Sequence, residues 1–530
     1  MKIKILLLLL MVFFYVSLSA QLCTGSSFQK VFEAPNDERA HSICATADGG
    51  YIIVGETNSA GAGGKDVFAM KLDVNGNQIW SKTYGTTKTD DGSSLSIIET
   101  QDGGYLFAGH TDGVNGYVVK LDASGNVQWE KKEPDTLYRG LKELANGDIA
   151  LVGNAYSFGS GTGTGAALLV RVSSSGTMLW SKGFGGSDQE QMYNVLELVN
   201  GDLLIVGGTS SYGLGVGDAF IVKTTSSGNL IWSKNYGGPG NESYYSAKLL
   251  NDGNIVVVGM TTSYGAGNDD ILLSKIDTSG VVLWTKIYGG TNIDRGEQVE
   301  ENEDGELILV GYSNSVGSGD YDKVLLNIDN TGVVNWIKAY GYLVEDEVDR
   351  WGNPMVLSQD SGVVMVGGTK SFGFGDENIY VVKTNSCGET FCYENDVIFS
   401  VSTPSINSGS PNASTSNSGS FSSVVSSVAA ISFTTTVLCD SNLVGINNTL
   451  NQLINILVAP NPNNGQFNVV INNNEVALIE VYDVMGKQVF VQNNVNANKT
   501  TIDLTDQSKG VYFVRVSIGE QVLNEKVVYQ

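Results

Sequence analysis

The sequence contains little proline, little histidine and little charge. Of its 530 residues, 8 are proline and 2 are histidine, whereas 65 are glycine. Charged residues make up 16%, below the roughly 25% of average soluble proteins. Most turns are therefore expected to use glycine rather than proline. The two histidines, His41 and His110, stand at non-equivalent places of the repeat described below, so we interpret both as incidental and find no catalytic group.

Basic residues are outnumbered. The chain has 31 Lys and Arg against 56 Asp and Glu, which gives a net charge of −25. Nucleic acids and anionic lipids bind to basic surfaces, so the composition argues against nucleic acid as a partner. The excess of carboxylates is compatible with cation binding, but solubility explains it as well, and we expect neither a cofactor nor a bound metal.

A long hydrophobic run occurs only near the start of the chain. Two lysines precede the apolar run Ile5–Val16, and the small residues of Ser17–Ala20 follow it. This is the pattern of a secretory signal peptide, here residues 1–20, with cleavage between Ala20 and Gln21. A transmembrane anchor, the alternative, needs a longer run. We therefore expect the mature protein outside the cytoplasm.

Cysteine is absent from the middle of the sequence. The five cysteines lie at the edges of the repeat region, and none occurs between Cys44 and Cys387. In an oxidising compartment this placement predicts disulfides that fasten the ends of a ring. We expect Cys392 to pair with Cys439. The other partners stay open, and the odd number leaves one thiol free or in an intermolecular bond.

The centre of the chain is a repeat of about 50 residues, the first feature to seek in a long sequence. One mark of the repeat is a tryptophan followed two residues later by lysine, at Trp80, Trp129, Trp180, Trp232, Trp284 and Trp336. A second mark is a turn glycine four residues before that position, which occurs in seven copies, at Gly76, Gly125, Gly176, Gly228, Gly280, Gly332 and Gly388.

Each copy reads as four short strands. Apolar runs such as Ile255–Gly259 and Ile271–Lys275 are bounded by Asp-Gly and Gly-Gly turns, which are hairpin signals. Four strands in about 50 residues indicate a β-propeller, here of seven blades over residues 21–390. A β-solenoid is the alternative, but its rungs are usually shorter.

The ends of the repeat indicate how the ring closes. The seventh copy stops after Lys383–Gly388 without a tryptophan strand, and Phe28–Phe32 resembles that missing strand. We therefore expect the N-terminal segment to pair into the last blade, which removes a free sheet edge. Cys23 and Cys387 then lie on either side of this join.

The recurring residues have a structural explanation. A tryptophan that occurs once per blade most economically packs one blade on the next. The turn Asp73–Gly76 lacks the alternating carboxylates and distal glutamate of a calcium loop, so we interpret its aspartate as the cap of its own turn.

Two resemblances follow from these residues. Asp73–Gly76 followed by Trp80 resembles the tryptophan-docking repeat of quinoprotein propellers, with a turn one residue shorter. That family's enzymes bind a quinone and calcium, and many carry adjacent cysteines, which this chain lacks; the resemblance implies a way of packing blades and not the chemistry. The region from Phe28 to Gly388 is more similar to the propeller-like repeats of large bacterial surface proteins, most of which have no assigned activity.

The C-terminal part changes composition twice. Residues 391–457 are rich in Ser, Thr and Asn, which is typical of a linker, although their β-branched patches leave short strands open. Residues 458–530 alternate apolar and polar positions between turns, which predicts a small β-sandwich. The predicted fold class is thus all-β, with a seven-bladed propeller, a Ser/Thr-rich linker and a sandwich.

The predicted sandwich contains recognisable sequence motifs. It closely resembles the type A C-terminal sorting domain of type IX secretion cargo, which implies export by the signal peptide and then by the type IX translocon. In that family the domain is often removed, and the protein is attached to surface lipopolysaccharide or released. The matching positions are Pro460, Asn461, Pro462, Gly465, Tyr482, Asp483, Gly486, Lys487, Gly510, Tyr512 and Lys526.

Two functions remain in view. The first is a surface-displayed binding, adhesion or structural propeller with a glycan or protein ligand. The second is a secreted hydrolase or lyase acting on polysaccharide at the mouth of the central channel. Carboxylate pairs such as Asp90-Asp91 and Asp269-Asp270 fall in loops of different copies. The insertion Leu343–Trp351 is the place where specialisation is first expected.

Overall fold

The chain folds into two compact units, Met1–Val444 and Gly445–Gln530. A computed structural model describes residues 23–86, 95–111, 115–156, 165–318, 320–342, 345–346, 353–373, 377–411, 413–417, 419–441, 456–459, 464–471, 477–483, 487–495, 499–518 and 521–529. Strands and turns account for the regular structure in these ranges, and none of the described residues is helical. No helix in the described ranges is long and apolar enough to cross a membrane. The expected cleavage site at Ala20 and Gln21 lies outside these residues.

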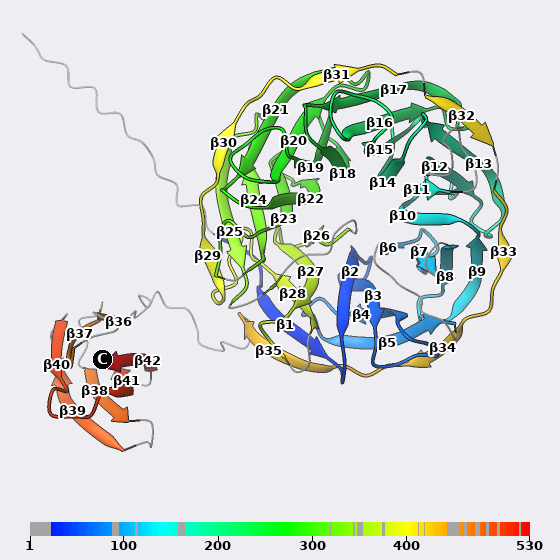
Figure 1. Ribbon diagram of the computed structural model, residues 1–530. Helices are drawn as coiled ribbons and strands as arrows, with labels where there is room; N and C mark the ends of the chain where they lie inside the picture. Colours follow the sequence, from blue (N-terminus) through cyan, green and yellow to red (C-terminus); the bar gives the residue numbers. More distant parts are fainter. Residues whose placement is uncertain are drawn as a thin grey trace, which may run out of the picture. The chain divides into compact units, whose positions relative to one another are not determined.

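The first unit is a ring of seven antiparallel sheets around a central channel (Figure 1). This confirms the predicted propeller. The first three blades consist of β2 (Glu38–Ala45), β3 (Tyr51–Thr57), β4 (Asp66–Leu72) and β5 (Gln78–Gly85), then β6 (Ser96–Glu99), β7 (Tyr105–Thr111), β8 (Asn115–Leu121) and β9 (Val127–Glu133), then β10 (Thr136–Glu143), β11 (Ile149–Ala155), β12 (Ala166–Val172) and β13 (Met178–Gly185).

The next three blades repeat this order, with the first strand of each at the channel. They are β14 (Glu190–Glu197), β15 (Leu203–Thr209), β16 (Asp218–Thr224) and β17 (Leu230–Gly237), then β18 (Glu242–Leu249), β19 (Ile255–Thr261), β20 (Asp270–Ile276) and β21 (Val282–Gly289), then β22 (Asp294–Glu301), β23 (Leu307–Ser313), β24 (Asp322–Ile328) and β25 (Val334–Tyr340). Blade 7 is built from β26 (Met355–Leu357), β27 (Val363–Thr369), β28 (Asn378–Lys383) and β1 (Phe28–Glu33).

The middle strands of each blade are apolar on both faces because neighbouring blades cover both faces. Every residue of β3, β4 and β23 is buried. The apolar clusters accordingly lie between blades: one joins Val256 and Leu273 of blade 5 to Leu309 of blade 6. Continuous apolar runs in these strands thus follow from blade stacking, whereas an outer strand such as β5 keeps exposed side chains in its first half.

The recurring tryptophan lies against the glycine turn of the following blade. A Cβ atom at Gly125 would come within 2.7 Å of the Trp80 ring, and one at Gly388 within 2.6 Å of the Trp336 ring. The five turn glycines that face a tryptophan are Gly125, Gly176, Gly228, Gly280 and Gly388. At Gly332 the nearest atoms belong to Lys286, while the Trp284 indole donates to Asn330 O at 3.3 Å.

The aspartate of the same turn caps it, as interpreted from the sequence. Asp73 Oδ1 accepts hydrogen bonds from the backbone N–H groups of Asn75 at 2.9 Å and Asn77 at 2.8 Å. Gly76 has a φ of +71°, a conformation that favours glycine. One turn thus needs a carboxylate for its cap and a glycine both for its backbone and for the ring that lies against it.

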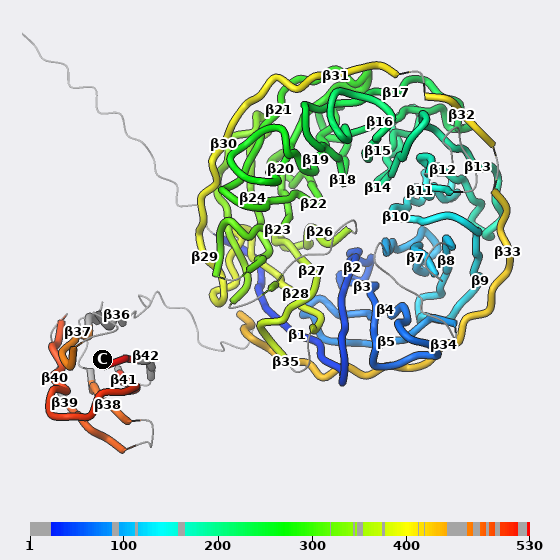
Figure 2. The backbone as a smooth tube through the Cα atoms, viewed as in Figure 1, coloured from blue at the N-terminus to red at the C-terminus, as the bar shows by residue number. Residues whose placement is uncertain are grey.

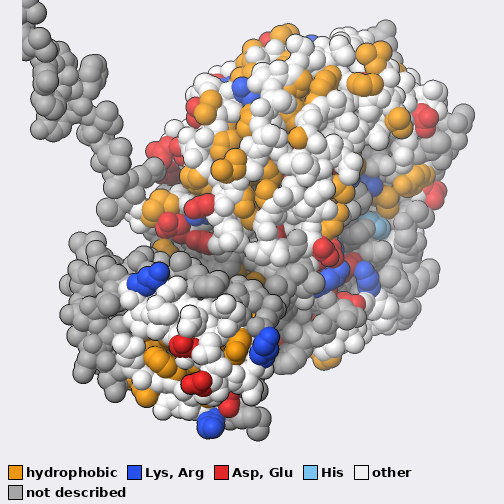
Figure 3. All heavy atoms as spheres, turned by 60° about the vertical axis from the view of Figure 1, so that its left-hand side comes forward, with side chains coloured by type: hydrophobic (Ala, Val, Ile, Leu, Met, Phe, Trp, Pro, Cys, Tyr) orange, Lys and Arg blue, Asp and Glu red, His pale blue; other side chains and the backbone are white. Residues whose placement is uncertain are grey.

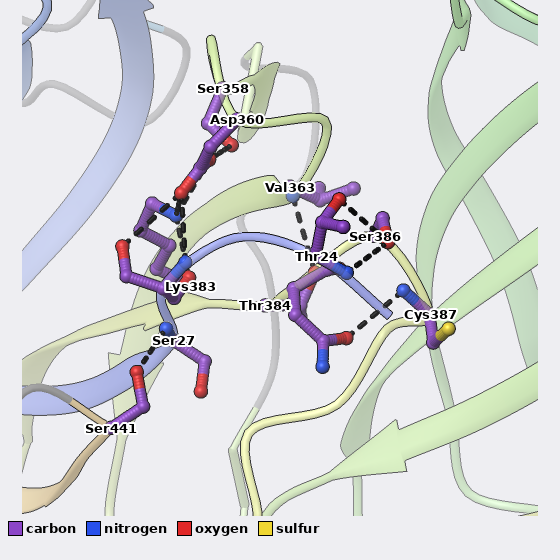
Figure 4. A network of polar contacts seen from close by, with 12 residues as sticks. Thr24, Ser27, Ser358, Asp360, Val363, Lys383, Thr384, Ser386, Cys387 and Ser441 are labelled. Atoms are coloured by element: carbon purple, nitrogen blue, oxygen red, sulfur yellow. Dashed lines mark hydrogen bonds and ion pairs between the residues drawn. The ribbon is translucent and has the colours of Figure 1, made fainter. Parts of the chain in front are cut away.

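The ring closes at a join between the two ends of the repeat region, here called the seam. β1 pairs antiparallel with β28, with Phe28 opposite Lys383 and Phe32 opposite Ile379, which confirms the predicted closure. Figure 4 shows the polar contacts beside this pairing: Lys383 Nζ lies 2.7 Å from Asp360 Oδ2, which also accepts from Ser26 N at 2.9 Å. A disulfide joins Cys23 to Cys387 at the same place.

Residues 394–440 encircle the ring as a belt (Figure 2). The structure differs here from the linker expected over 391–457. Each short strand adds a fifth strand to one blade, and the belt visits blades 6, 5, 4, 3, 2, 1 and 7 in turn, against the order of the chain. The strands are β29 (Glu394–Asp396), β30 (Ser400–Ser402), β31 (Asn407–Gly409), β32 (Ser414–Asn417), β33 (Ser422–Ser423), β34 (Ser427–Ala430) and β35 (Thr434–Asp440).

The belt is held by backbone pairing and by single apolar side chains. Ser and Thr side chains of the belt stay largely exposed, and some donate to the last carbonyl of the outer strand that the belt extends, as Ser400 Oγ does to Gly289 O at 2.7 Å and Ser414 Oγ does to Gly185 O at 2.9 Å. One or two apolar belt residues join the cluster at each blade interface: Phe399, Ile406, Ala413, Phe421, Val424, Ile431 with Phe433, and Leu438. On the outer wall seen in Figure 3, apolar side chains are scattered among polar ones.

The two ends of the belt are joined to each other. Cys392 and Cys439 form a disulfide, the clasp, as expected from the sequence. β35 then pairs with β1, so the belt ends in the blade that the N-terminus completes. Cys44 is the free thiol among the described residues.

The second unit is a small sandwich, described by itself. One sheet has the order β36 (Ile456–Ala459), β37 (Gln466–Ile471) and β40 (Lys499–Asp503), and the other has β39 (Gln488–Val495), β38 (Ala477–Asp483), β41 (Gly510–Ile518) and β42 (Gln521–Tyr529). Their facing side chains form a core that includes Phe467, Ile479, Val514 and Val527.

Deletion of Gln21–Phe32 from the mature protein should lower its melting temperature and promote association. The last blade loses its fourth strand, and β35 loses the strand to which it is paired. Removal of an equal length from within residues 442–455, beyond the end of β35, is the matched control. Calorimetry and light scattering measure both effects. Equal melting temperatures for the two deletions would show that the seam contributes nothing to the ring.

Replacement of both clasp cysteines, Cys392→Ser with Cys439→Ser, should reduce the free energy of unfolding by about 4 kcal/mol in the chain-entropy model of a closed loop. The sequence separation of 47 residues sets that loop. Cys44→Ala, which touches no disulfide, should cost much less. Denaturant titration of the three proteins checks this, and an unchanged midpoint in the double variant would contradict it.

Candidate binding site in the central channel

One end of the channel opens into a cavity, here called the vestibule. Its volume is about 610 Å³, and the innermost strands of all seven blades line it. Such a volume is within the usual range for a small-ligand site. The vestibule lies on the side where the inner strands end, since its lining includes the last residues of β2, β6, β10 and β22.

The lining differs from blade to blade. At the next-to-last position of the inner strand the seven copies carry Cys44, Ile98, Lys142, Leu196, Lys248, Glu300 and Val356. The fold does not demand this variety, because the outer positions of the same blades repeat their tryptophan, lysine and glycine. The vestibule is therefore the part of the ring where the repeats have become specialised.

The carboxylates of the vestibule are engaged with their neighbours. Glu99 accepts from Ala47 N at 2.7 Å, and Glu143 accepts from Gln101 N at 2.8 Å, so each ties its blade to the preceding one. Glu301 does the same with Asn251 N at 2.7 Å. Glu300 pairs with Lys248, with 2.5 Å between the carboxylate and ammonium groups. These carboxylates hold the blades together and also contribute negative charge to the lining of the cavity.

The inner strands contain β-bulges, and the large side chains at these bulges form a layer in the ring. In five blades one inner-strand residue falls in a break of register with the second strand. These bulge residues are polar or aromatic and are each less than a tenth exposed: His41, Arg139, Tyr193, Tyr245 and Glu297. Bulges redirect side chains and often occur near functional sites, so this layer also departs from the repeat.

Neighbouring members of this layer contact one another. The Tyr193 and Tyr245 rings meet edge to face with 5.2 Å between their centroids, and the Arg139 guanidinium lies 5.3 Å from the Tyr193 centroid. Arg139 also donates to the Asn154 side chain. These contacts couple blades 3, 4 and 5 from the inside.

The two histidines lie close enough to interact, although they occupy non-equivalent places in the repeat. His41 Nε2 lies 3.8 Å from Glu56 Oε2, and His110 belongs to the neighbouring blade. The pKa of His110 is lowered to about 4, chiefly by burial and also by the nearby charges of Arg139 and His41. His110 is therefore neutral in the folded ring at ordinary pH.

Within the insertion expected to be specialised, Leu343–Trp351, the structure describes Glu345 and Asp346. Asp346 accepts hydrogen bonds from the Thr369 and Ser371 side chains, which anchors the segment to blade 7. Shortly after the insertion, Asn353 lines the vestibule and donates from its side chain to Ser96 Oγ of blade 2 at 2.9 Å. Ile43 N of blade 1 donates to Asn353 O at 2.9 Å. Asn353 thus joins three blades.

The carboxylate pair Asp269 and Asp270 noted in the sequence does not line the vestibule. Asp269 forms an ion pair with Arg295, and burial raises the pKa of Asp270. Asp90 and Asp91 lie outside the described residues. In the described part of the chain no three His, Cys, Asp or Glu side chains are arranged to hold a metal ion.

The sorting residues fall in three groups. Pro460, Asn461, Pro462 and Gly486 lie outside the described residues. Gly465 occupies a left-handed position with a φ of +100°, and Tyr482 donates to Glu480 Oε1 at 2.8 Å. Lys526 pairs with Phe513 across β41 and β42. Asp483, Lys487, Gly510 and Tyr512 line one groove, which is taken up below.

Comparison with known families identifies the second unit. Residues 457–530 match the family described as the secretion system C-terminal sorting domain. The unit is thus a type IX sorting domain, as the sequence indicated. A search of the curated proteins gave no match.

Several solved structures match the chain at low similarity. A fungal alcohol oxidase of the AA5 family in complex with copper is 10% identical, with a TM-score of 0.41 over 96% of this chain and 100% of its own. A puromycin hydrolase mutant is 14% identical, with a TM-score of 0.41 over 67% of this chain and 55% of its own. Sqt1 from Chaetomium thermophilum is 12% identical, with a TM-score of 0.38 over 65% and 82%.

The fold and the sorting domain together define the class of protein. It is a β-propeller cargo of the type IX secretion system, and it reaches the cell surface or the medium through the periplasm. The type IX machinery is accordingly a partner of this chain.

His110→Gln should flatten the pH dependence of stability. Because the pKa of His110 is about 4 in the ring against an ordinary 6.5, the unfolded chain takes up its proton first, and the free energy of unfolding falls as the pH drops through this window. The variant should recover about 3 kcal/mol of that fall. Denaturant titrations above and below the window measure it.

Glu133 titrates in an overlapping range, since burial raises its pKa to about 7, but it does so in both proteins and cancels in the comparison. Parallel pH profiles for the wild type and the variant would contradict the placement of His110 as a buried neutral group.

Proposed function

We propose that the exported ring is a binding module and that its ligand enters the vestibule. One observation carries the proposal: the inner strands of all seven blades line a cavity of about 610 Å³, and equivalent positions there hold different residues. A purely structural ring needs no such variety at its centre. The rest of the blade keeps its repeated residues, so the specialisation is confined to the channel.

The lining favours a peptide segment over a glycan. None of the residues that border the vestibule in the described ranges is aromatic, whereas Ile98, Leu141, Val195 and Met355 supply aliphatic walls. Sugar rings usually stack on flat aromatic faces, which this cavity does not offer. The Lys142 and Lys248 ammonium groups beside several glutamates suit a segment that has an aliphatic side chain and charges of both signs.

A hydrolase or lyase acting on polysaccharide is the alternative. Glycoside hydrolysis needs two carboxyl groups that flank the scissile bond. Glutamates do border the vestibule, but Glu99, Glu143 and Glu301 accept backbone hydrogen bonds between blades, and Glu300 pairs with Lys248. Groups with such structural partners are poorly placed to move protons, which supports binding rather than catalysis.

Vestibule variants test the proposal with two probes. Fluorescently labelled mature protein is applied to a peptide array and to a glycan array. We expect binding on the peptide array, and we expect Ile98→Trp, which fills the cavity from a half-buried position, to weaken it by about tenfold or more, corresponding to at least about 1.4 kcal/mol. Leu179→Trp, on the outer strand β13 where the leucine is 49% exposed, is the matched control.

The outcomes separate the candidates. Binding that is lost in Ile98→Trp and retained in Leu179→Trp supports the vestibule. Binding confined to glycans would overturn the ligand class, and binding that both variants retain would overturn the site. Release of reducing ends from a polysaccharide, abolished by Ile98→Trp, would establish the hydrolase instead.

A further inference from the structure

Residues from two separate sequence motifs of the sorting domain line one groove. Asp483 and Lys487 belong to one motif, and Gly510 and Tyr512 belong to another that follows it in the sequence. All four line a groove of about 320 Å³ in the second unit, here called the sorting groove. Its other lining residues are Val489, Gln507, Ser508, Lys509 and Val511.

Backbone hydrogen bonds fix both walls of the groove. β38 and β41 are neighbours, and Asp483 stands opposite Tyr512 in their register. On one wall Asp483 N donates to Lys487 O at 3.0 Å, and Lys487 N donates to Asp483 Oδ1 at 2.9 Å. On the other, Gln507 N donates to Leu504 O at 2.8 Å, and the buried Tyr512 donates its hydroxyl to Ser508 O. The groove is thus preformed in the folded unit.

The two described sorting glycines differ in the space around them. Gly465 has a φ of +100°, and an added Cβ would lie 2.9 Å from Thr505 and 3.0 Å from Tyr529. Gly510 has a φ of 158°, at the border of the region that favours glycine, and an added Cβ would meet nothing within 4 Å. Glycine at 465 is therefore favoured both by its backbone and by the crowding around it, whereas at 510 the backbone favours glycine and the space beside it is open.

The lysine side chains of the groove make no described contribution to the stability of the fold. Lys487 and Lys509 are exposed, and neither forms an ion pair within the described part of the unit. Asp483, by contrast, accepts a hydrogen bond within its own turn through one carboxylate oxygen. Two cationic side chains thus stand at the edge of a groove whose sides include Val489 and Val511.

We propose that the sorting groove is the surface by which the type IX export machinery recognises this chain, and that its occupant is an acidic, extended loop of a machinery subunit. The lysines attract the carboxylates of the loop. The open floor at Gly510 admits its backbone, because no side chain stands there. The valines bury its aliphatic groups. This recognition concerns the second unit alone and does not depend on a ligand in the vestibule.

Export of the full-length chain in the bacterium that makes it tests the groove. The variants are Lys487→Glu with Lys509→Glu, which reverses the charge, and Gly510→Leu, which fills the floor. Lys499→Glu, at an exposed lysine of β40 outside the groove, is the matched control, and removal of residues 458–530 gives the reference for failed export. Fractionation followed by immunoblotting measures the protein in the periplasm and at the surface or in the medium.

Both groove variants should be lost from the surface and the medium and should accumulate in the periplasm, as the truncated chain does, whereas Lys499→Glu should be exported like the wild type. The double variant Lys487→Arg with Lys509→Arg should be exported like the wild type, since it keeps both positive charges. Thermal melts of the purified variants show whether the second unit stays folded. If Gly510→Leu unfolds that unit, the charge-reversed pair alone decides the matter.

Normal export of the folded, charge-reversed protein would overturn the proposal. Failure of the arginine pair would overturn the acidic loop, because a charge-based partner accepts either cation. These readouts are independent of array binding, so failure of the vestibule proposal leaves them unchanged.

Discussion

The ring depends on one strand from the N-terminus that pairs on both sides with segments from the far end of the chain. β1 lies between β28, the last blade strand in sequence, and β35, the last strand of the belt. Every backbone group of a strand in that position can be satisfied, which an edge strand cannot achieve. The ends of the ring, the end of the belt and both disulfides all meet at this blade, so the closure of the first unit depends on it.

The sequence predicted the features that repeat. Seven turn glycines with only six tryptophan strands indicated a missing strand, and Phe28–Phe32 supplied it because it carries the same alternation as its counterparts. The belt could not be predicted in the same way, since its strands are short, its side chains are mainly Ser, Thr and Asn, and its pairing uses mainly backbone groups. Its signal was an apolar residue about every seven positions, as at Phe399, Ile406 and Ala413.

The candidate sites were harder to foresee because their residues are distant in sequence. Sequence comparison of the copies registers what they share, whereas the vestibule is made of what they do not share, such as Lys142, Leu196 and Glu300. His41 and His110 looked unrelated because one sits in a first strand and the other in a second strand. The sorting residues were recognised as a set, but only the register of β38 with β41 shows which of them face a common groove.

The position of the clasp determines how the molecule carries tension. Cys439 comes just before the stretch that leads to the second unit, and Cys392 comes just after Cys387, which is bonded to Cys23. A pull on the C-terminal side, as in a protein tethered to a cell in flowing liquid, passes from Cys439 to Cys392 through a covalent bond and does not load the belt strands in between. It then reaches the start of the ring through a second covalent bond. Hydrogen-bonded strands are thus spared, and a mechanical load of this kind cannot unwind the blades one after another.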